Sequence, residues 1–298
     1  MARSYQADEI KEKLIDILQN QKTGLSGLEI SERIGINRIT MTKYLQVFAA
    51  EGFIKQKNIG NVIIWFIEDG TEQFHFPDDY FKIKSKYLEF ITERSQNHAY
   101  NLIRNCLHSK AKPTKIIIDV IVPAIKSVHD LFHQGKIGNS ELNLLEKIIS
   151  NSIQIINLES FDTIPKKNII VISADQKSVL LSEAASACFH AEGWHVYSLG
   201  DMSTSIDVLF DLDLQKFVAK IWKPGSGMMI ITIFSSTIEG MKFFSESINT
   251  IKGKFGKKLY LTLCGNVEKN SNVKADLLEE DLEMILQWSE TKFQSSFS

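Results

Sequence analysis

Seven polar and basic side chains in a short N-terminal stretch are of the kinds that bind nucleic acids. They are Arg38, Thr40, Thr42, Lys43, Gln46, Lys55 and Lys57. Arginine, glutamine and threonine hydrogen-bond to base edges, whereas lysine commonly pairs with phosphates. Residues 37–61 carry four bases against one acid, a local charge of +3, although the whole chain has a net charge of −2. The electrostatic case for a nucleic-acid partner is therefore local.

The hydrophobic pattern predicts the elements that would position these side chains. Apolar residues at helical spacing predict three helices, over residues 8–21, 26–34 and 38–51. The third helix is predicted to bury one stripe of side chains, namely Met41, Leu45 and Phe48. Asn37 is a suitable N-cap for this helix, and Gly52 is suited to end it. Two β-prone runs joined by a turn then predict a hairpin, with strands at 53–56 and 62–67.

Three helices and a hairpin, with the stretch NRITMTKYLQVFAAEGFIKQKNIGNVIIWF, resemble a winged helix-turn-helix domain over residues 1–70. The resemblance implies that the third helix enters the major groove of double-stranded DNA, with the side chains from Arg38 to Gln46 at base edges. Lys55 and Lys57 would then meet phosphates. It also implies a homo-oligomer, because such domains usually bind two half-sites. The alternative is a winged helix that serves protein contacts. The apolar hairpin residues are interpreted as packing, and they are Ile63, Trp65 and Phe66.

A helical pattern covers residues 79–160, after a polar linker at 70–78. The predicted helices suggest a four-helix bundle and cover residues 79–94, 97–108, 114–134 and 140–158. Pro123 lies inside the third of them and is predicted to kink it, because proline removes a backbone hydrogen bond. His129 and His133 lie one turn apart and could share a metal. No third ligand has a matching spacing, so we interpret them as surface or core histidines.

A second set of polar side chains follows the predicted strands of residues 166–298. They are Ser173, Asp175, Lys177, Ser235, Ser236 and Thr237. The predicted strands are 168–173, 194–199, 227–234 and 258–263. A helix that ends at Gly193 is predicted between the first two strands, and further helices are predicted over 238–253 and 276–293. This alternation is typical of a doubly wound, Rossmann-like parallel sheet, whose ligands bind at the carboxyl ends of the strands. These side chains could bind a ligand there, and the alternative is that they cap helices and fill turns.

The bundle and the sheet together resemble the helical cap and Rossmann-like domain of cobalamin-binding proteins, among them light-sensing cobalamin-dependent repressors. Pro123 and Gly135 match the cap, and Phe132 stands where the family has a ligand-facing tryptophan. Leu142 and Asn143 stand where the family has a Glu-His pair. In the sheet domain the resemblance also covers three turns, Ser198–Gly200, Ser235–Thr237 and Cys264–Gly265.

The first loop of that family reads D-x-H-x-x-G, in which the histidine binds cobalt and the glycine admits the nucleotide tail. Asp175 matches, but Lys177 replaces the histidine and Leu180 replaces the glycine. A protonated lysine has no lone pair to give to cobalt. The cofactor therefore stays open, since cobalamin binding without a histidine ligand exists in the wider family.

We therefore expect a DNA-binding transcriptional regulator whose C-terminal module senses a small-molecule effector or drives assembly. One alternative is a corrinoid-binding protein of methyl transfer. Another is a DNA-binding protein whose degenerate sensor only mediates assembly. No nucleophile–base–acid set, G-x-S-x-G motif, P-loop or metal cluster is present in the sequence, so we do not expect an enzyme.

The composition agrees with a globular protein, with 44% hydrophobic and 23% charged residues among 298. No apolar stretch is long enough for a membrane span, and the N-terminal sequence MARSYQADEIKEKL has no apolar signal segment. We therefore expect a cytoplasmic protein without a membrane partner. Three distant cysteines, Cys106, Cys188 and Cys264, are expected to be reduced and to act as small apolar residues.

Overall fold

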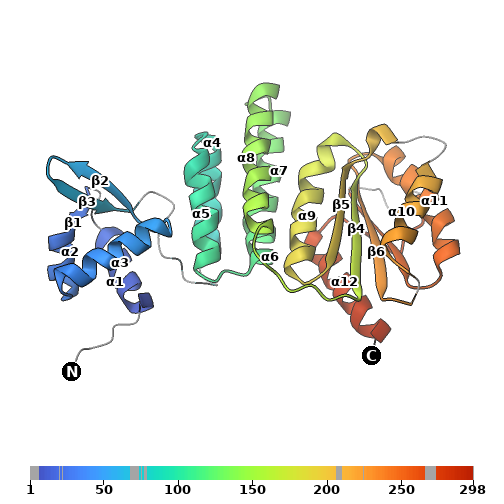
Figure 1. Ribbon diagram of the computed structural model, residues 1–298. Coiled ribbons are helices and arrows are strands. Elements are labelled where there is room, and N and C mark those ends of the chain that lie inside the picture. Colours follow the sequence, from blue (N-terminus) through green and yellow to red (C-terminus); the bar gives the residue numbers. More distant parts are fainter. Residues whose placement is uncertain are drawn as a thin grey trace. The chain divides into compact units, whose positions relative to one another are not determined.

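The computed structural model is shown in Figure 1, and it describes residues 7–19, 21, 23–67, 74, 76, 79–205, 210–223, 225–265 and 273–297. The chain divides into two compact units, Met1–Ala111 and Lys112–Ser298, each of which is described by itself. Most of the predicted linker at 70–78 lies outside the described residues. The boundary between the units separates the first two helices of the predicted bundle from the others, so that bundle stays a prediction.

The described part of the first unit contains five helices and three strands. They are α1 (Ala7–Gln19), β1 (Leu25–Ser26), α2 (Gly27–Ile34), α3 (Arg38–Ala50), β2 (Lys55–Ile59), β3 (Val62–Phe66), α4 (Tyr80–Thr92) and α5 (Gln96–His108). In the antiparallel sheet β3 lies between β1 and β2, with Leu25 opposite Trp65 and Lys55 opposite Phe66. The three predicted helices and the hairpin are present, but the first strand of the hairpin covers residues 55–59 rather than 53–56. Strand β1 was not predicted.

Local hydrogen bonds set the ends of α2 and α3. The Ser26 hydroxyl accepts from the backbone N–H of Glu29, and the Glu29 carboxylate accepts from the backbone N–H of Ser26, which is a capping box. The Asn37 side chain accepts from the backbone N–H of Ile39 at 2.9 Å, as predicted for an N-cap. The predicted apolar stripe of α3 is buried, and it packs with Ile30 and Trp65 in the core of this unit.

The second unit is a mixed α/β structure around one parallel five-stranded sheet. Its helical segments are α6 (Pro113–Ile116), the π-helical turn η1 (Ile117–Ile121), α7 (Val122–His133), α8 (Asn139–Asn157), the 3-10 turns η2 (Gln176–Ser178) and η3 (Ser203–Ser205), α9 (Val179–Ala191), α10 (Phe210–Ile221), α11 (Ile238–Phe255) and α12 (Leu282–Phe297). Its strands are β4 (Lys167–Ser173), β5 (His195–Asp201), β6 (Met228–Phe234), β7 (Leu259–Cys264) and β8 (Leu277–Glu279), in the spatial order β5-β4-β6-β7-β8. No helix of the described residues is both long and apolar enough to cross a membrane.

Two elements of this unit differ from the prediction. Helix α10 was not predicted. The helix predicted over 276–293 was wrong at its start, because residues 277–279 form the edge strand β8, which pairs with β7. Helix α12 begins only at Leu282 and continues to Phe297.

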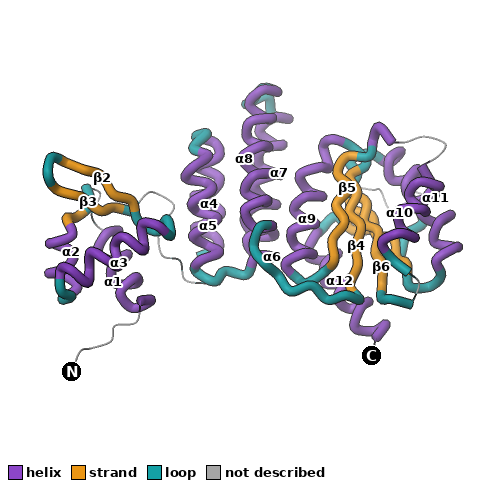
Figure 2. Tube along the Cα trace, viewed as in Figure 1, coloured by secondary structure: helices purple, strands orange, loops and turns teal. Residues whose placement is uncertain are grey.

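Helices cover both faces of the sheet (Figures 1 and 2). Helices α10 and α11 pack on one face, where their apolar side chains meet alternate residues of β4, β6 and β7. Helix α9 contacts β4 and β5, and α12 contacts α9 and β6. Every residue of β4 and β6 is buried, which explains why both strands are continuous apolar runs.

Pro123 is accommodated by a change of helix type. Residues 113–133 are helical throughout, but the segment just before Pro123 is the π-helical turn η1, in which Val122 N–H donates to the Ile117 carbonyl five residues back. Proline has no N–H to donate, and π turns are a known way for a helix to absorb such a break. The helix therefore departs from α-helical geometry at residues 117–121, and the kink itself stays a prediction.

The C-terminal helix is attached to the sheet by a polar cluster around Glu290. Its carboxylate accepts hydrogen bonds from the Lys167 ammonium at 2.7 and 2.8 Å and from the Trp194 indole N–H at 2.6 Å. The side chain of Lys167 is only 8% exposed and that of Glu290 is 26% exposed. Removing one partner would therefore leave a buried charge without its counterion.

We predict that Glu290→Gln lowers the free energy of unfolding by about 2 kcal/mol, because a buried ammonium loses its counterion. Urea denaturation measures this change. The matched control is Glu283→Gln on the same helix, whose pair with Lys115 at 3.1 Å is more exposed. It should cost less than about 1 kcal/mol. Equal effects of the two substitutions would show that the Glu290 cluster adds nothing special to stability.

Candidate functional site

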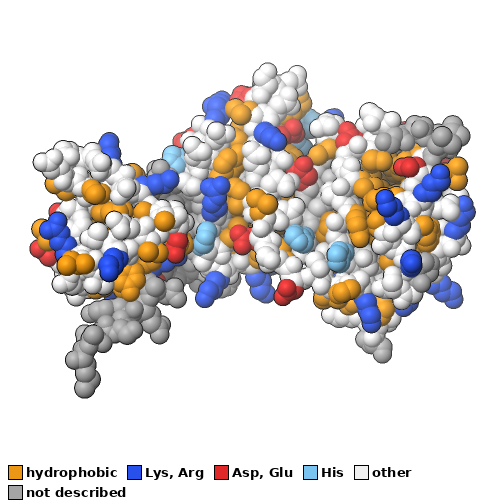
Figure 3. Space-filling model, in the orientation of Figure 1, with side chains coloured by type: hydrophobic (Ala, Val, Ile, Leu, Met, Phe, Trp, Pro, Cys, Tyr) orange, Lys and Arg blue, Asp and Glu red, His pale blue; other side chains and the backbone are white. Residues whose placement is uncertain are grey.

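The outward face of α3 carries the predicted base-reading side chains. Because α3 buries its apolar stripe, the residues on its other faces point away from the core. All seven side chains predicted to meet DNA are exposed: Arg38, Thr40, Thr42, Lys43, Gln46, Lys55 and Lys57. The hydroxyl of Thr42 donates to the Arg38 carbonyl at 2.8 Å. On the face shown in Figure 3, Lys and Arg side chains are scattered rather than gathered in one patch, in keeping with a near-neutral chain.

Apolar side chains accompany these polar ones, and the sequence analysis did not single them out. Ile39 on α3 is 72% exposed, and Val47 on the same helix is also exposed. In the hairpin Trp65 is buried as interpreted, whereas Ile63 is 44% exposed within the first unit. Ile39 lies opposite the buried stripe of α3, so its helical position could have revealed it. An aliphatic side chain there is suited to contact a thymine methyl group.

The second set of predicted residues meets at the carboxyl edge of the parallel sheet, with Asp175 at its centre. One carboxylate oxygen accepts from the backbone N–H and the hydroxyl of Ser178, at 3.0 and 2.9 Å. The other accepts from the Ser235 hydroxyl at 3.0 Å and from the Ser236 N–H at 2.7 Å. Burial alone would raise the pKa of Asp175, but the hydrogen bonds from Ser236, Ser178 and Ser235 outweigh it and hold the pKa below its ordinary value.

The other loop residues also bond within the protein. The Ser173 hydroxyl donates to the Asp175 carbonyl at 2.6 Å, and the Thr237 hydroxyl caps α11 by accepting from Gly240 N–H. The backbone N–H of Ser235 donates to the Cys264 carbonyl, which joins the loops after β6 and β7. Most of this set therefore caps helices and fills turns, as the alternative interpretation had it. The side chains of Lys177 and Ser236 are exposed.

A shallow hollow of about 280 Å³ lies between α8 and the start of α9. Its lining includes Glu146 and Lys147 on α8 and Lys177 and Glu183 beyond β4. Leu180, at the position of the family's glycine, also borders the hollow and is only 7% exposed. Phe132 on α7 is half-buried and is not among the residues that line it.

No set of three metal-binding side chains occurs among the described residues. His129 instead pairs with Glu146, with 2.9 Å between its Nε2 and the carboxylate. The three cysteines are free, as expected, and all three are buried. Burial raises the pKa of Cys106 and Cys264 to about 12 and raises that of Cys188 as well, so all three stay protonated thiols.

The strand order of the sheet, with its crossover between β4 and β6, defines an open α/β fold of the flavodoxin-like order. No protein-family model and no curated protein matches the sequence. Among solved structures, the fold is similar to the monomethylamine corrinoid protein of Methanosarcina barkeri. The two share 16% identity and a TM-score of 0.54, over 72% of this chain and 99% of that one. At this identity the similarity concerns the fold alone.

Two further structures are more distant. A cobalamin-binding protein from Desulfitobacterium hafniense has a TM-score of 0.38 at 11% identity, over 69% of this chain and 98% of that chain. The methanol:cobalamin methyltransferase complex MtaBC of M. barkeri has a TM-score of 0.36 at 16% identity, over 78% of this chain and 89% of that chain. TM-scores below 0.5 are too low to bear on the fold.

The residues at the carboxyl edge do not suit a cobalamin whose cobalt is bound by a protein side chain. Lys177 cannot ligate cobalt while it is protonated. Leu180, which takes the place of the glycine in the family's loop motif, is buried, and both oxygens of Asp175 already accept hydrogen bonds. The hollow beside them is below the usual range of about 300–1,000 Å³ even for drug-sized ligands. We therefore derive no cobalt chemistry for this chain.

Proposed function

We propose that this chain is a DNA-binding regulator. The first unit would bind duplex DNA through α3 and the β2–β3 hairpin. The second unit, with the fold of a corrinoid protein, would relay an effector signal or hold the regulator in an oligomer. The observation that carries the proposal is the exposed polar face of α3 beside a hairpin with exposed lysines.

The topology of the first unit supports this proposal. Its order α1-β1-α2-α3-β2-β3, with an antiparallel sheet in the order β1-β3-β2, resembles a winged helix-turn-helix. In such domains the second helix of the motif enters the major groove and the hairpin lies along the backbone. Here α3 is capped by Asn37 and anchored by its buried stripe, so its outer side chains are held on a rigid support.

The roles of the side chains follow from their chemistry. Arg38 can donate two parallel hydrogen bonds to a guanine edge, and Gln46 is suited to adenine. Lys55 and Lys57 on β2 would neutralise phosphates, which positions the domain without reading sequence. Local positive charge of this kind supplies affinity even when the whole chain is slightly acidic.

A second candidate is a corrinoid-binding protein, and the fold similarity favours it. One solved structure with a similar fold is a corrinoid protein, and Asp175 matches the first residue of the family's loop. In this case cobalamin would bind without a lower ligand from the protein. The residues at the edge argue against it, and a direct binding measurement separates the two candidates.

We predict that Arg38→Ala combined with Lys43→Ala weakens binding to a duplex selected from a random pool by about 30-fold or more, because two base-edge contacts are lost. Fluorescence anisotropy measures the affinity. The control is Lys13→Ala with Lys82→Ala, which removes the same charge from α1 and α4. If the α3 variant binds as tightly as wild type, α3 is not the recognition helix.

We predict that the wild-type chain retains no cobalamin after incubation and desalting, as judged by its ultraviolet–visible spectrum. The double variant Lys177→His, Leu180→Gly should retain it, because the variant supplies a cobalt ligand and a path for the nucleotide tail. Leu180→Gly alone is the control for the path. A wild-type chain that stays coloured would favour the corrinoid candidate, and a colourless double variant would contradict the alignment of this loop.

A further inference from the structure

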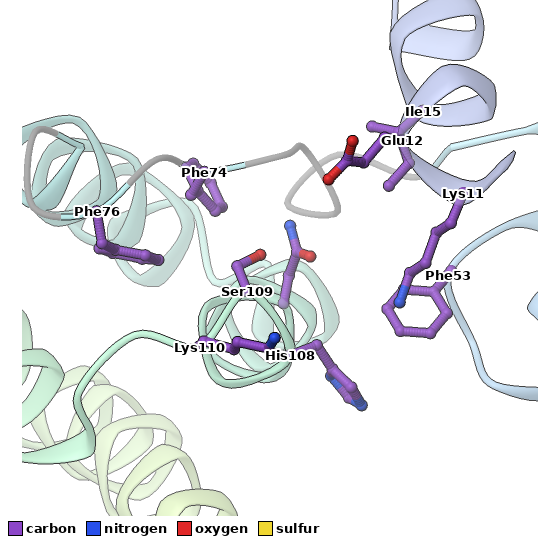
Figure 4. Close-up of a pocket in the computed structure, with 10 residues that line it drawn as sticks. Lys11, Glu12, Ile15, Phe53, Phe74, Phe76, His108, Ser109 and Lys110 are labelled. Atoms are coloured by element: carbon purple, nitrogen blue, oxygen red, sulfur yellow. The ribbon is translucent and has the colours of Figure 1, made fainter. Parts of the chain in front are cut away.

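A cavity of about 570 Å³ opens within the first unit, away from the outer face of α3. It lies between α1, the turn from α3 to β2 and the end of α5 (Figure 4). Its volume falls within the range of about 300–1,000 Å³ that small-molecule sites commonly have. Neither candidate function above makes use of it.

Aromatic rings form the apolar part of its lining. Figure 4 shows Phe74 and Phe76 on one side of the end of α5 and Phe53 on the other. Phe53 also packs edge-on against the His108 ring, with 5.0 Å between the ring centroids. Each of these flat apolar surfaces suits a planar ligand, because aromatic rings stack or meet edge to face.

The charged part of the lining favours an anion. Two lysines, Lys11 and Lys110, line the cavity against a single acid, Glu12. The Lys11 ammonium lies 3.0 Å from the centroid of the Phe53 ring, which places positive charge beside an aromatic wall. A ligand that joins an aromatic ring to a negative group would match both features.

The end of α5 supplies further polar groups. His108 Nδ1 lies 2.7 Å from the Arg104 carbonyl, and a carbonyl only accepts, so Nδ1 carries the hydrogen. Nε2 is thus the ring nitrogen left for another partner. Lys110 has a φ of 61°, a left-handed conformation that glycine or asparagine usually adopts. Here it closes the end of α5, where the Ala111 N–H donates to the Cys106 carbonyl.

We propose that this cavity binds a small aromatic carboxylate, with its ring against the phenylalanines and its carboxylate paired with Lys11 or Lys110. Phe53 stands between α3 and β2, so a bound ligand would tie these two elements to the end of α5. Ligand binding would then alter DNA affinity through differential contacts. Only this last consequence rests on the proposed function.

The test titrates the full chain with 2-naphthoate and with its neutral isostere 2-naphthamide, by calorimetry. Saturable binding of the carboxylate is expected, with the amide at least about tenfold weaker, a difference of about 1.4 kcal/mol. Lys110→Asn, which keeps a residue suited to positive φ, and Lys11→Gln should each weaken the carboxylate about fivefold. Lys13→Gln, on α1 but outside the cavity, is the matched control and should have no effect.

Three results would overturn the proposal: no saturable binding of 2-naphthoate, equal binding of the amide, or an equal loss in Lys13→Gln. The comparison of 2-naphthoate with 2-naphthamide on the wild-type chain tests the proposal even if a variant fails to fold. Anisotropy with duplex DNA, with and without 2-naphthoate, tests the regulatory consequence separately. Ligand binding without any DNA binding would refute the proposed function but support the ligand site. DNA binding without ligand binding would support the proposed function but refute the ligand site.

Discussion

The Asp175 carboxylate links the loops at the carboxyl edge of the parallel sheet through hydrogen bonds. Whether that edge can bind a ligand depends on these bonds. The carboxylate accepts four hydrogen bonds from two loops, at the point where the strand order reverses between β4 and β6. In open α/β sheets this crevice is the usual ligand site. Here the protein's own hydroxyl and amide groups bond to both oxygens of the Asp175 carboxylate. A side chain at Gly265 would collide with the Ser235 carbonyl, so the third loop is also close-packed against them.

The two units therefore differ in how many unsatisfied polar side chains their described residues expose. The first unit directs polar, basic and aliphatic side chains of α3 outward from a rigid core, as a surface that binds a macromolecule requires. The second unit satisfies its polar loop residues internally, and its C-terminal helix is tied down by the Lys167–Glu290 pair. Because both oxygens of Asp175 are bonded within the protein, this edge offers few unsatisfied polar groups to a large cofactor. This contrast is the physical basis of our proposal that the first unit binds DNA.

The sequence predicted most of this fold where hydrophobic periodicity was strong. The α3 stripe, the Asn37 cap and the fully buried strands β4 and β6 were all recognisable from spacing and local chemistry. Strand β8 was not, because three half-buried or exposed residues at a sheet edge carry no period. At the candidate sites, residue types identified Asp175 and Ser235, but not that they bond each other across 60 positions. The cavity at Phe53 and Lys110 depends on contacts between distant segments, and no local pattern signals it.

The most direct test of the closed edge is the pKa of Asp175 itself, measured by NMR from its carboxyl carbon. An ordinary aspartate has a pKa of about 3.9. The hydrogen bonds predict that the pKa of Asp175 lies below this value. Because the folded pKa is then lower than the unfolded one, this stabilisation is complete above the unfolded pKa and is lost as the pH falls through the folded pKa. A value at or above the ordinary one would contradict the account, since it would mean that the loops leave the carboxylate free for a ligand.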